Sequence, residues 1–223
     1  MTYHHFLFAA VETEKLFNLI SLMTYGVLAL LALWGAFCVI IVWIRVGRQR
    51  FKNESEQQEF LTDVEPRLAA GDFDEAAGLC DGDPRVVPQL TLVAIKNRSI
   101  GYAKVKKLVM DRFQRDVLSD LEQRLSWVNT VIESAPMVGL FGTVFGMMGA
   151  FAKLASSSNV QASALASDIN VALRTTASGL AIAIPLVILT NSVNIRIRGM
   201  EDLVSAGVGR ILDTLRERLS TKK

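Results

Sequence analysis

The sequence predicts an all-α membrane protein with three transmembrane helices, the second and third of which extend into a helical cytoplasmic region. Hydrophobic residues make up 51% of the 223 positions and charged residues 21%, and the two kinds are segregated along the chain. Acidic and basic side chains are absent from 16–44, 134–152 and 175–195. Each gap is close to the roughly 20 apolar residues that a helix needs to cross a bilayer. This pattern excludes a soluble globular domain, a disordered chain and, with only two cysteines, a disulfide scaffold.

Residues 1–22 are expected to form an interfacial helix on the outer side of the membrane, because apolar side chains already gather there before the first span. A frayed apolar N-terminus is the alternative. Residues 23–44 are predicted to be transmembrane helix 1, whose Leu, Ala, Val, Ile and Trp composition is typical of a lipid-facing helix. The apolar run is too long for the core of a signal peptide, so this span is expected to be retained.

Basic residues beside the spans predict the orientation. Four of them follow the first span, at Arg45, Arg48, Arg50 and Lys52, and further bases follow the third span. The positive-inside rule then places the N-terminus outside and the C-terminus in the cytoplasm. The net charge of +2 is too small to indicate a nucleic-acid partner.

Residues 45–130 are predicted to be a cytoplasmic helical region. Gly71–Asp72 interrupts one helical pattern, and residues 81–84 (DGDP) are typical of a turn. An apolar stripe from Val105 to Val128 then leads directly into the second span. Residues 196–223 continue the third span as a cytoplasmic C-terminal helix, and the two extensions are expected to pack together.

Transmembrane helix 2 (131–152) and transmembrane helix 3 (174–195), joined by an outer connection (153–173), are rich in small residues. Glycine recurs at Gly139, Gly142 and Gly146 in the second span and at Gly179 in the third. Such stripes let helix backbones approach closely within a membrane. Packing alone explains them most simply; they do not form a phosphate-binding loop, because no Gly-Lys-Ser/Thr follows.

Hydroxyl side chains accompany these glycines. Thr143 lies in the second span, and Thr175 and Thr176 lie in the third. A single hydroxyl in a membrane helix most often bonds its own backbone. Because both helices offer threonines beside small residues, a shared polar lining is the stronger interpretation.

Charged side chains are confined to the ends of the second and third spans, at Glu133, Lys153 and Arg174. Intramembrane charges are default candidates for function, but the two basic residues lie at the outer ends and can extend to the headgroups. No carboxylate lies in mid-membrane, so this chain alone lacks an acidic relay for protons. If ions cross here, another molecule must supply the acid.

These residues resemble a known family. Residues 134–148 (SAPMVGLFGTVFGMM) and 172–185 (ALRTTASGLAIAIP) are similar to the second- and third-span signatures of the MotA/TolQ/ExbB proton-channel family, closest to its ExbB/TolQ branch. Residues 69–80 also resemble the helical insert of that family. Pro136 and Pro185 match as well, and a proline inside a helix frees a backbone carbonyl and allows a kink.

The resemblance implies an ion-driven motor or stator subunit of a bacterial inner membrane, with a periplasmic N-terminus. It implies a homopentamer around a dimer of a single-span partner similar to ExbD or TolR, whose membrane aspartate carries the ion. The ion would be H⁺ or Na⁺, with no other cofactor and no metal. The work would pass to a TonB/TolA-like envelope protein and energise a process such as nutrient import.

The resemblance assigns the ion pathway to Thr143 and Thr176, with Thr175 beside them. Many ExbB and TolQ proteins carry a glutamate five residues before the third-span threonine, where this chain has Val171. Two expectations follow for the outer entrance: either it differs from that of those proteins, or Asp168 or Arg174 shapes it. Glu133 is a candidate for the cytoplasmic exit, although a solvated charge at a helix end is the simpler explanation.

Two other functions remain to be weighed. A membrane scaffold that clusters a partner without ion flux would tolerate valine in place of the threonines. An intramembrane hydrolase would need a nucleophile and a base facing each other, and the spans contain no Ser/His or Asp/Asp arrangement. The chain is therefore not expected to be an enzyme.

Overall fold

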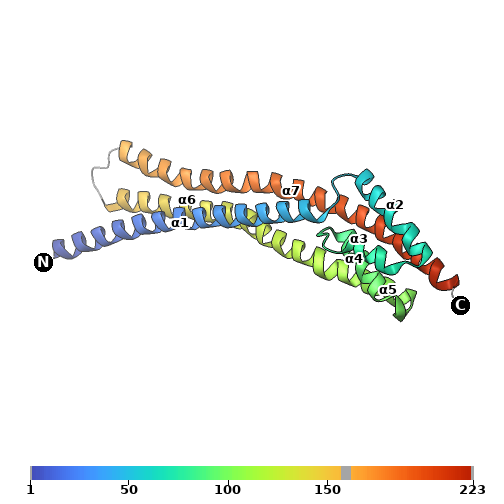
Figure 1. Ribbon diagram of the computed structural model, residues 1–223. Coiled ribbons are helices and arrows are strands. Elements are labelled where there is room, and N and C mark those ends of the chain that lie inside the picture. The colour runs from blue at the N-terminus through green and yellow to red at the C-terminus, as the bar shows by residue number, and fades with distance from the viewer. Residues whose placement is uncertain (1, 157–161, 222–223) are drawn as a thin grey trace. The chain divides into compact units, whose positions relative to one another are not determined.

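The computed structural model describes the backbone of residues 2–156 and 162–221, and side-chain surroundings for 19–155, 163 and 165–218. These residues are helical with short connections, and no strand occurs among them, which confirms the predicted fold class. The elements follow one another along the chain in Figure 1: α1 (Thr2–Gln49), α2 (Glu54–Ala70), α3 (Phe73–Cys80), α4 (Val86–Lys96), the 3₁₀ segment η1 (Arg98–Ile100), α5 (Tyr102–Arg112), the π-helical segment η2 (Phe113–Leu118), α6 (Ser119–Ser156) and α7 (Ala162–Thr221).

Three helical stretches are long and apolar enough to cross a membrane: Leu19–Gln49, Tyr102–Ala155 and Leu165–Arg218. The protein is thus a multi-pass membrane protein. Helices α6 and α7 both extend into the predicted outer connection (153–173), where residues 153–156 and 162–173 are helical. Residues 157–161 of this connection lie outside the described residues. The backbone of residues 2–22 is helical and continuous with the first span. Its predicted position on a membrane surface stays a prediction.

The chain divides into two compact units. We call residues 1–39 and 126–190 the span unit, and residues 40–125 and 191–223 the bundle unit. Helices α1, α6 and α7 each contribute to both units, whereas α2 to α5 belong entirely to the bundle unit.

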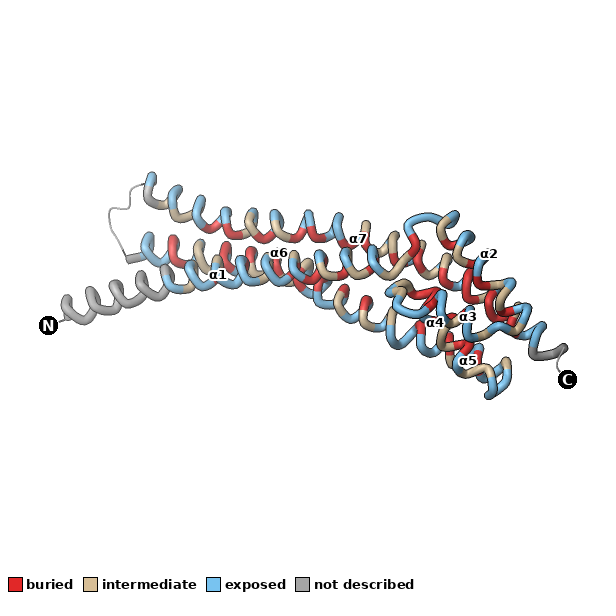
Figure 2. The backbone as a smooth tube through the Cα atoms, viewed as in Figure 1, coloured by how far each residue is buried: buried red, intermediate tan, exposed pale blue. Residues whose placement is uncertain are grey.

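The bundle unit has its own hydrophobic core between the short helices and the C-terminal part of α7. Burial colouring shows the buried positions gathered where these elements meet (Figure 2). The core cluster comprises Leu61, Val64, Leu68, Ala76, Cys80, Ile95 and Ile211. The helix break predicted at Gly71–Asp72 lies at the end of α2. Gly71 follows the last residue of α2 with a φ of +92°, a conformation that glycine adopts without strain.

The apolar stripe that leads toward the second span contains a π-helical segment that the sequence analysis did not anticipate. The stripe repeats mostly every four residues, so on an α-helix of 3.6 residues per turn it would drift steadily around the helix. The π-helical turn of η2 (Phe113–Leu118) holds more residues than an α-helical turn, and so compensates for the difference between the four-residue repeat and 3.6 residues per turn. As a result, Val109, Phe113 and Leu121 are all buried.

The bundle part of α7 packs mainly against the short helices. Gln57 on α2 donates a 2.7 Å hydrogen bond to the carbonyl oxygen of Leu203. Arg210 forms a 2.8 Å ion pair with Glu65, also on α2. This part of α7 also contacts the helices that lead into the second span. The Arg216 guanidinium lies 5.5 Å from the centre of the Tyr102 ring on α5.

Apolar side chains cover much of the surface of the span unit. Leu22, Leu30, Leu33 and Phe37 on α1 are each more than half exposed in the single chain, as expected of side chains that face lipid. The other face of α1 packs on the remaining spans, where Gly35 lies beside Leu186 of α7 and Val131 of α6.

Candidate functional site

The three predicted threonines of the span unit come together between α6 and α7. The Thr143 Oγ1 lies within hydrogen-bonding distance of the Thr176 Oγ1 and 3.4 Å from the Thr175 Oγ1. Thr143 and Thr175 are only 7% and 1% exposed, and Thr176 is partly buried. We call these three residues the threonine cluster.

Two backbone carbonyl oxygens lie within hydrogen-bonding distance of the hydroxyl groups of the cluster. The Ala172 oxygen lies 2.9 Å from the Thr143 Oγ1 and 2.7 Å from the Thr175 Oγ1. The Gly139 oxygen lies 3.0 Å from the Thr175 Oγ1, 3.1 Å from the Thr176 Oγ1 and 3.2 Å from the Thr143 Oγ1. Each hydroxyl therefore has an acceptor within the chain.

The supply of hydroxyl protons exceeds the lone pairs available on these carbonyls. Within an α-helix each carbonyl oxygen already accepts one backbone N–H from four residues later. One lone pair then remains on Gly139 and one on Ala172, whereas the three threonines bring one proton each. One hydroxyl must therefore donate to another hydroxyl or outward, so the distances allow more than one hydrogen-bond arrangement of the cluster.

Glycine makes this close approach of α6 and α7 sterically feasible. A Cβ on Gly139 would lie 2.7 Å from the Thr175 backbone oxygen and 3.0 Å from the Thr176 Cα. On Gly146 it would lie 2.7 Å from the Ala172 Cβ, and on Gly179 it would clash with the Ala135 oxygen. The small-residue stripes identified in the sequence thus lie where the two backbones meet.

Comparison with known proteins identifies the family. A sequence model of the MotA/TolQ/ExbB proton channel family matches residues 96–205, which include the whole threonine cluster. A biopolymer transport protein ExbB of Helicobacter pylori is 38% identical over 104 residues, covering 46% of this chain and 70% of the relative. The chain belongs to the MotA/TolQ/ExbB proton channel family.

Further relatives agree with the ExbB/TolQ branch. The Tol-Pal system protein TolQ of Haemophilus influenzae is 36% identical over 151 residues, which is 68% of this chain and 60% of that protein. A putative biopolymer transport protein ExbB-like 2 of Helicobacter pylori is 39% identical over 71 residues, or 32% of this chain. The chain spans about half the length of that relative, 47%.

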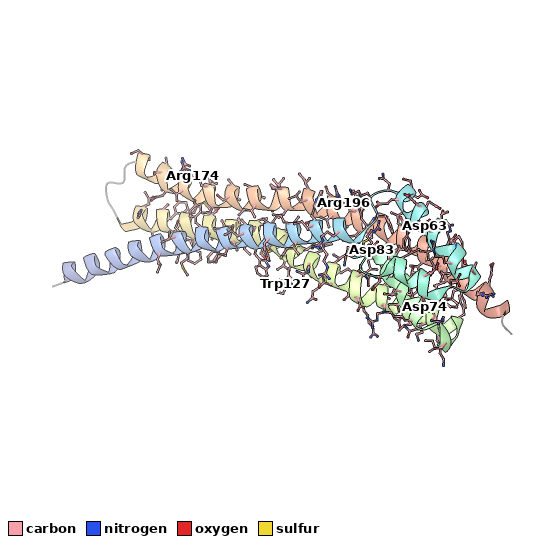
Figure 3. The ribbon with its side chains drawn as sticks, viewed as in Figure 1. Asp63, Asp74, Asp83, Trp127, Arg174 and Arg196 are labelled. Carbon is pink, nitrogen blue, oxygen red and sulfur yellow. The ribbon has the colours of Figure 1, made fainter. Side chains whose placement is uncertain are left out.

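The charged candidates of this ExbB/TolQ-family chain lie outside the cluster. Glu133 and Arg174 are both exposed, and Arg174 extends from the face of α7 that points away from α6 (Figure 3). Lys153 and Asp168 form a 3.1 Å ion pair between α6 and α7. Val171, where the family resemblance would place a glutamate, is 44% exposed.

The two prolines lie inside helices, Pro136 in α6 and Pro185 in α7. Pro136 is partly buried and packs near Gly179, since a Cβ on that glycine would lie 3.2 Å from the Pro136 Cα. Pro185 is exposed on the surface of the single chain.

Two polar residues that the sequence analysis passed over lie next to the cluster. Thr24 on α1 is 4% exposed, and its hydroxyl donates a 2.8 Å hydrogen bond to the Ile20 carbonyl oxygen. Ser21 lies one turn before it and lines a cavity that also reaches Thr175. Their signal in the sequence is a pair of small hydroxyl residues within the charge-free run 16–44, Ser21 in the predicted interfacial helix and Thr24 in the span whose composition is typical of a lipid-facing helix.

Ionisable groups with shifted pKa values lie in the bundle unit. Burial, together with the smaller effect of the nearby Asp83 charge, raises the pKa of the Cys80 thiol to about 12. Burial also acts to raise the pKa of Asp83, but hydrogen bonds from Arg85 outweigh it and lower the pKa below its usual range. The Arg85 guanidinium also pairs with Glu56 at 2.9 Å and lies 4.1 Å from the centre of the Phe51 ring.

Among the described residues, no group of three His, Cys, Asp or Glu side chains gathers to hold a metal ion.

Proposed function

We propose that this chain is the ion-conducting subunit of an ExbB/TolQ-like motor that converts ion-motive force into mechanical work on a single-span partner. The observation that carries the proposal is the threonine cluster, buried between two spans of a chain that belongs to a proton channel family. The chain is then a motor or stator subunit rather than an enzyme.

A hydroxyl cluster suits a role beside an acid that gains and loses a proton. A threonine hydroxyl donates a hydrogen bond to a carboxylate and accepts one from a protonated carboxylic acid. Because three protons share two carbonyl lone pairs, one hydroxyl is available to turn toward the acid without leaving a buried carbonyl unpaired. Valine has nearly the same shape and supports neither interaction.

The partner would supply the carboxylate that the spans of this chain lack. By the family resemblance, it is a dimer of an ExbD- or TolR-like protein bearing a membrane aspartate, held within a homopentamer of this chain. Relatives named ExbB and TolQ support an envelope process as the recipient of the work. A TonB- or TolA-like envelope protein would receive it, with nutrient import as one such process.

The proposed setting is the bacterial inner membrane, with the N-terminus in the periplasm and the C-terminus in the cytoplasm. The bases that follow the first and third spans support this orientation. Glu133 would then lie at the cytoplasmic mouth of the pathway and Arg174 near the periplasmic mouth. The driving ion is H⁺ in this proposal, with Na⁺ as the alternative.

The test uses the chain co-expressed with an ExbD- or TolR-like single-span protein, purified as a complex and reconstituted in vesicles. A pH-sensitive dye inside the vesicles reports proton flux under an imposed membrane potential. We expect Thr143→Val and Thr176→Val each to lower flux by about a hundredfold, because preorganised partners of a changing charge contribute on that scale. Repeating the measurement with a sodium gradient at constant pH identifies the driving ion.

Thr130→Val is the matched control, because Thr130 lies on the same helix, is exposed and donates only to the Ser126 carbonyl oxygen. It should conduct like the unmodified chain, and all variants should retain the native mass of the complex. Wild-type flux in both Thr143→Val and Thr176→Val would contradict the assignment of the pathway.

The same cluster gives one reason to consider a non-conducting scaffold. Every hydroxyl already has an acceptor within the chain, as expected of groups that only hold two helices together. A scaffold predicts no flux above the lipid leak in the assembled complex, and it predicts full partner binding by Thr143→Val and Thr176→Val.

A further inference from the structure

A small cavity lies beside the threonine cluster, between α1, α6 and α7 of the span unit. Its volume is about 30 Å³. Its lining includes Ser21 and Thr24 of α1, Gly142 of α6 and Thr175 of α7. It therefore connects the first span to the cluster that the other two spans form.

Three of the residues that line the cavity carry a hydroxyl group: Ser21, Thr24 and Thr175. Thr24 and Thr175 are 4% and 1% exposed, so their polar atoms are withdrawn from bulk solvent and from lipid. Both have backbone acceptors for their protons, with the Thr24 hydroxyl 2.8 Å from the Ile20 oxygen and the Thr175 hydroxyl 2.7 Å from the Ala172 oxygen. Their oxygen lone pairs remain as acceptors for the O–H groups of a small guest.

The size and chemistry of the cavity fit water. A water molecule needs at least about 10–15 Å³ of such space and two to four polar partners, whereas cavities lined only by apolar groups stay dry. This cavity has room for one or two waters and offers three hydroxyls. It is too small for an organic molecule.

The cavity depends on a missing side chain. A Cβ on Gly142 would lie 2.8 Å from the Thr175 Oγ1 and 2.9 Å from the Thr24 Cγ2. It would occupy the space between the Thr24 methyl group and the Thr175 hydroxyl. Glycine at this position therefore lets α1, α6 and α7 pack closely beside the cavity.

We propose that this cavity holds one or two waters that relay protons between the first span and the threonine cluster, with Thr24 and Ser21 as positioning residues. The inference rests on the proposed function. In the relay a proton delivered by water from outside the span unit joins the oxygen of the cavity water, and a different proton of that water passes to the Thr175 Oγ1. Thr175 in turn releases its own hydroxyl proton toward the Thr143 Oγ1, which lies 3.4 Å away, and Thr143 releases its proton toward the carboxylate. The water is neutral before and after, and the net change is the movement of one proton toward the partner's carboxylate.

The experiment measures proton flux in the reconstituted complex for Thr24→Val and Thr24→Ser. Valine keeps the shape but removes the hydroxyl, whereas serine keeps the hydroxyl and loses a methyl group. We expect Thr24→Val to lower flux by about tenfold, the effect of losing one hydrogen bond to the relay water, and Thr24→Ser to stay near wild type. Ser21→Ala is a second variant at the same cavity and should also lower flux, which keeps the test valid if Thr24→Val does not assemble.

The outcomes separate this inference from the function on which it rests. Wild-type flux in Thr24→Val and Ser21→Ala, together with loss of flux in Thr143→Val, would overturn the water relay and leave the proposed function intact. Equal losses in Thr24→Val and Thr24→Ser would show a packing effect and would also overturn the relay. Absence of flux from the assembled wild-type complex would overturn both.

Discussion

At the scale of single residues, the Cys80 thiol shows how the bundle unit controls its chemistry. Cys80 is fully buried in the core cluster, and its pKa rises from 9.0 to about 12. The thiolate is the reactive form. At pH 8 the folded protein should therefore hold a roughly thousandfold smaller thiolate fraction than the unfolded chain. We predict that Cys80 resists a water-soluble maleimide in the native protein and reacts after denaturation.

The labelling is read by mass spectrometry in a Cys38→Ala background, so that Cys80 is the single thiol. Gly78→Cys, made in a chain that lacks both cysteines, is the control, because Gly78 is an exposed position on the same helix with open space around it. It should be labelled readily in the native state. Rapid native labelling of Cys80 would mean that the core around it opens easily.

Part of the threonine cluster could be predicted from the sequence, and part of it could not. Thr143 and Thr176 were selected from hydroxyls beside small residues and from the family resemblance, and the structure brings them into contact. The shared use of the Gly139 and Ala172 carbonyls was not predictable, because it depends on the register of two helices far apart in the sequence. Thr24 was missed because an isolated threonine in a span usually bonds its own backbone, as it also does here.

At the scale of elements, the close contact of α6 and α7 depends on Gly139. Replacement by alanine would bring a Cβ to 2.7 Å from a backbone oxygen of α7, which cannot move aside as a flexible side chain can. We predict that Gly139→Ala lowers the stability of the purified protein by about 1–3 kcal/mol, the usual cost of overpacking. The midpoint of thermal unfolding in detergent measures this loss.

Gly26→Ala is the matched control on a neighbouring span. A Cβ there would meet nothing within 4 Å, and the position is exposed. Alanine is also the better helix former, so stability should be unchanged or slightly higher. Equal losses in the two variants would show that glycine matters for flexibility in general and not for the contact at Gly139.

Element boundaries were predictable where local chemistry decides them. The break at Gly71 and the turn at residues 81–84 follow from residues that favour such conformations. The π-helical segment Phe113–Leu118 was not predicted, although the four-residue spacing of its apolar stripe was visible. That spacing fits either a regular α-helix whose apolar stripe winds around its surface or a helix with one wider turn. Only the packing of the bundle unit decides which of the two forms.

At the scale of the whole molecule, the chain offers hydroxyl groups but no carboxylate in the charge-free stretches 134–152 and 175–195 of its second and third spans. Many of the larger apolar side chains of the span unit are also exposed in the single chain. In a membrane, lipid would cover part of such a surface, and in the proposed complex other subunits would cover the rest. Both features suit a subunit that works only within an assembly.

The corresponding prediction concerns the composition of the complex. Co-expression with an ExbD- or TolR-like single-span protein should yield a particle whose native mass fits five copies of this chain and two of the partner, each copy of this chain adding 24.5 kDa. Omitting the partner should leave the five-copy ring, since the exposed apolar faces still need covering. Replacing the partner's membrane aspartate by asparagine should leave the mass unchanged but remove flux, because the hydroxyl cluster has no proton to exchange with an amide. A monomer or dimer at native mass would contradict the assembly, and undiminished flux through the asparagine variant would show that the acid lies elsewhere.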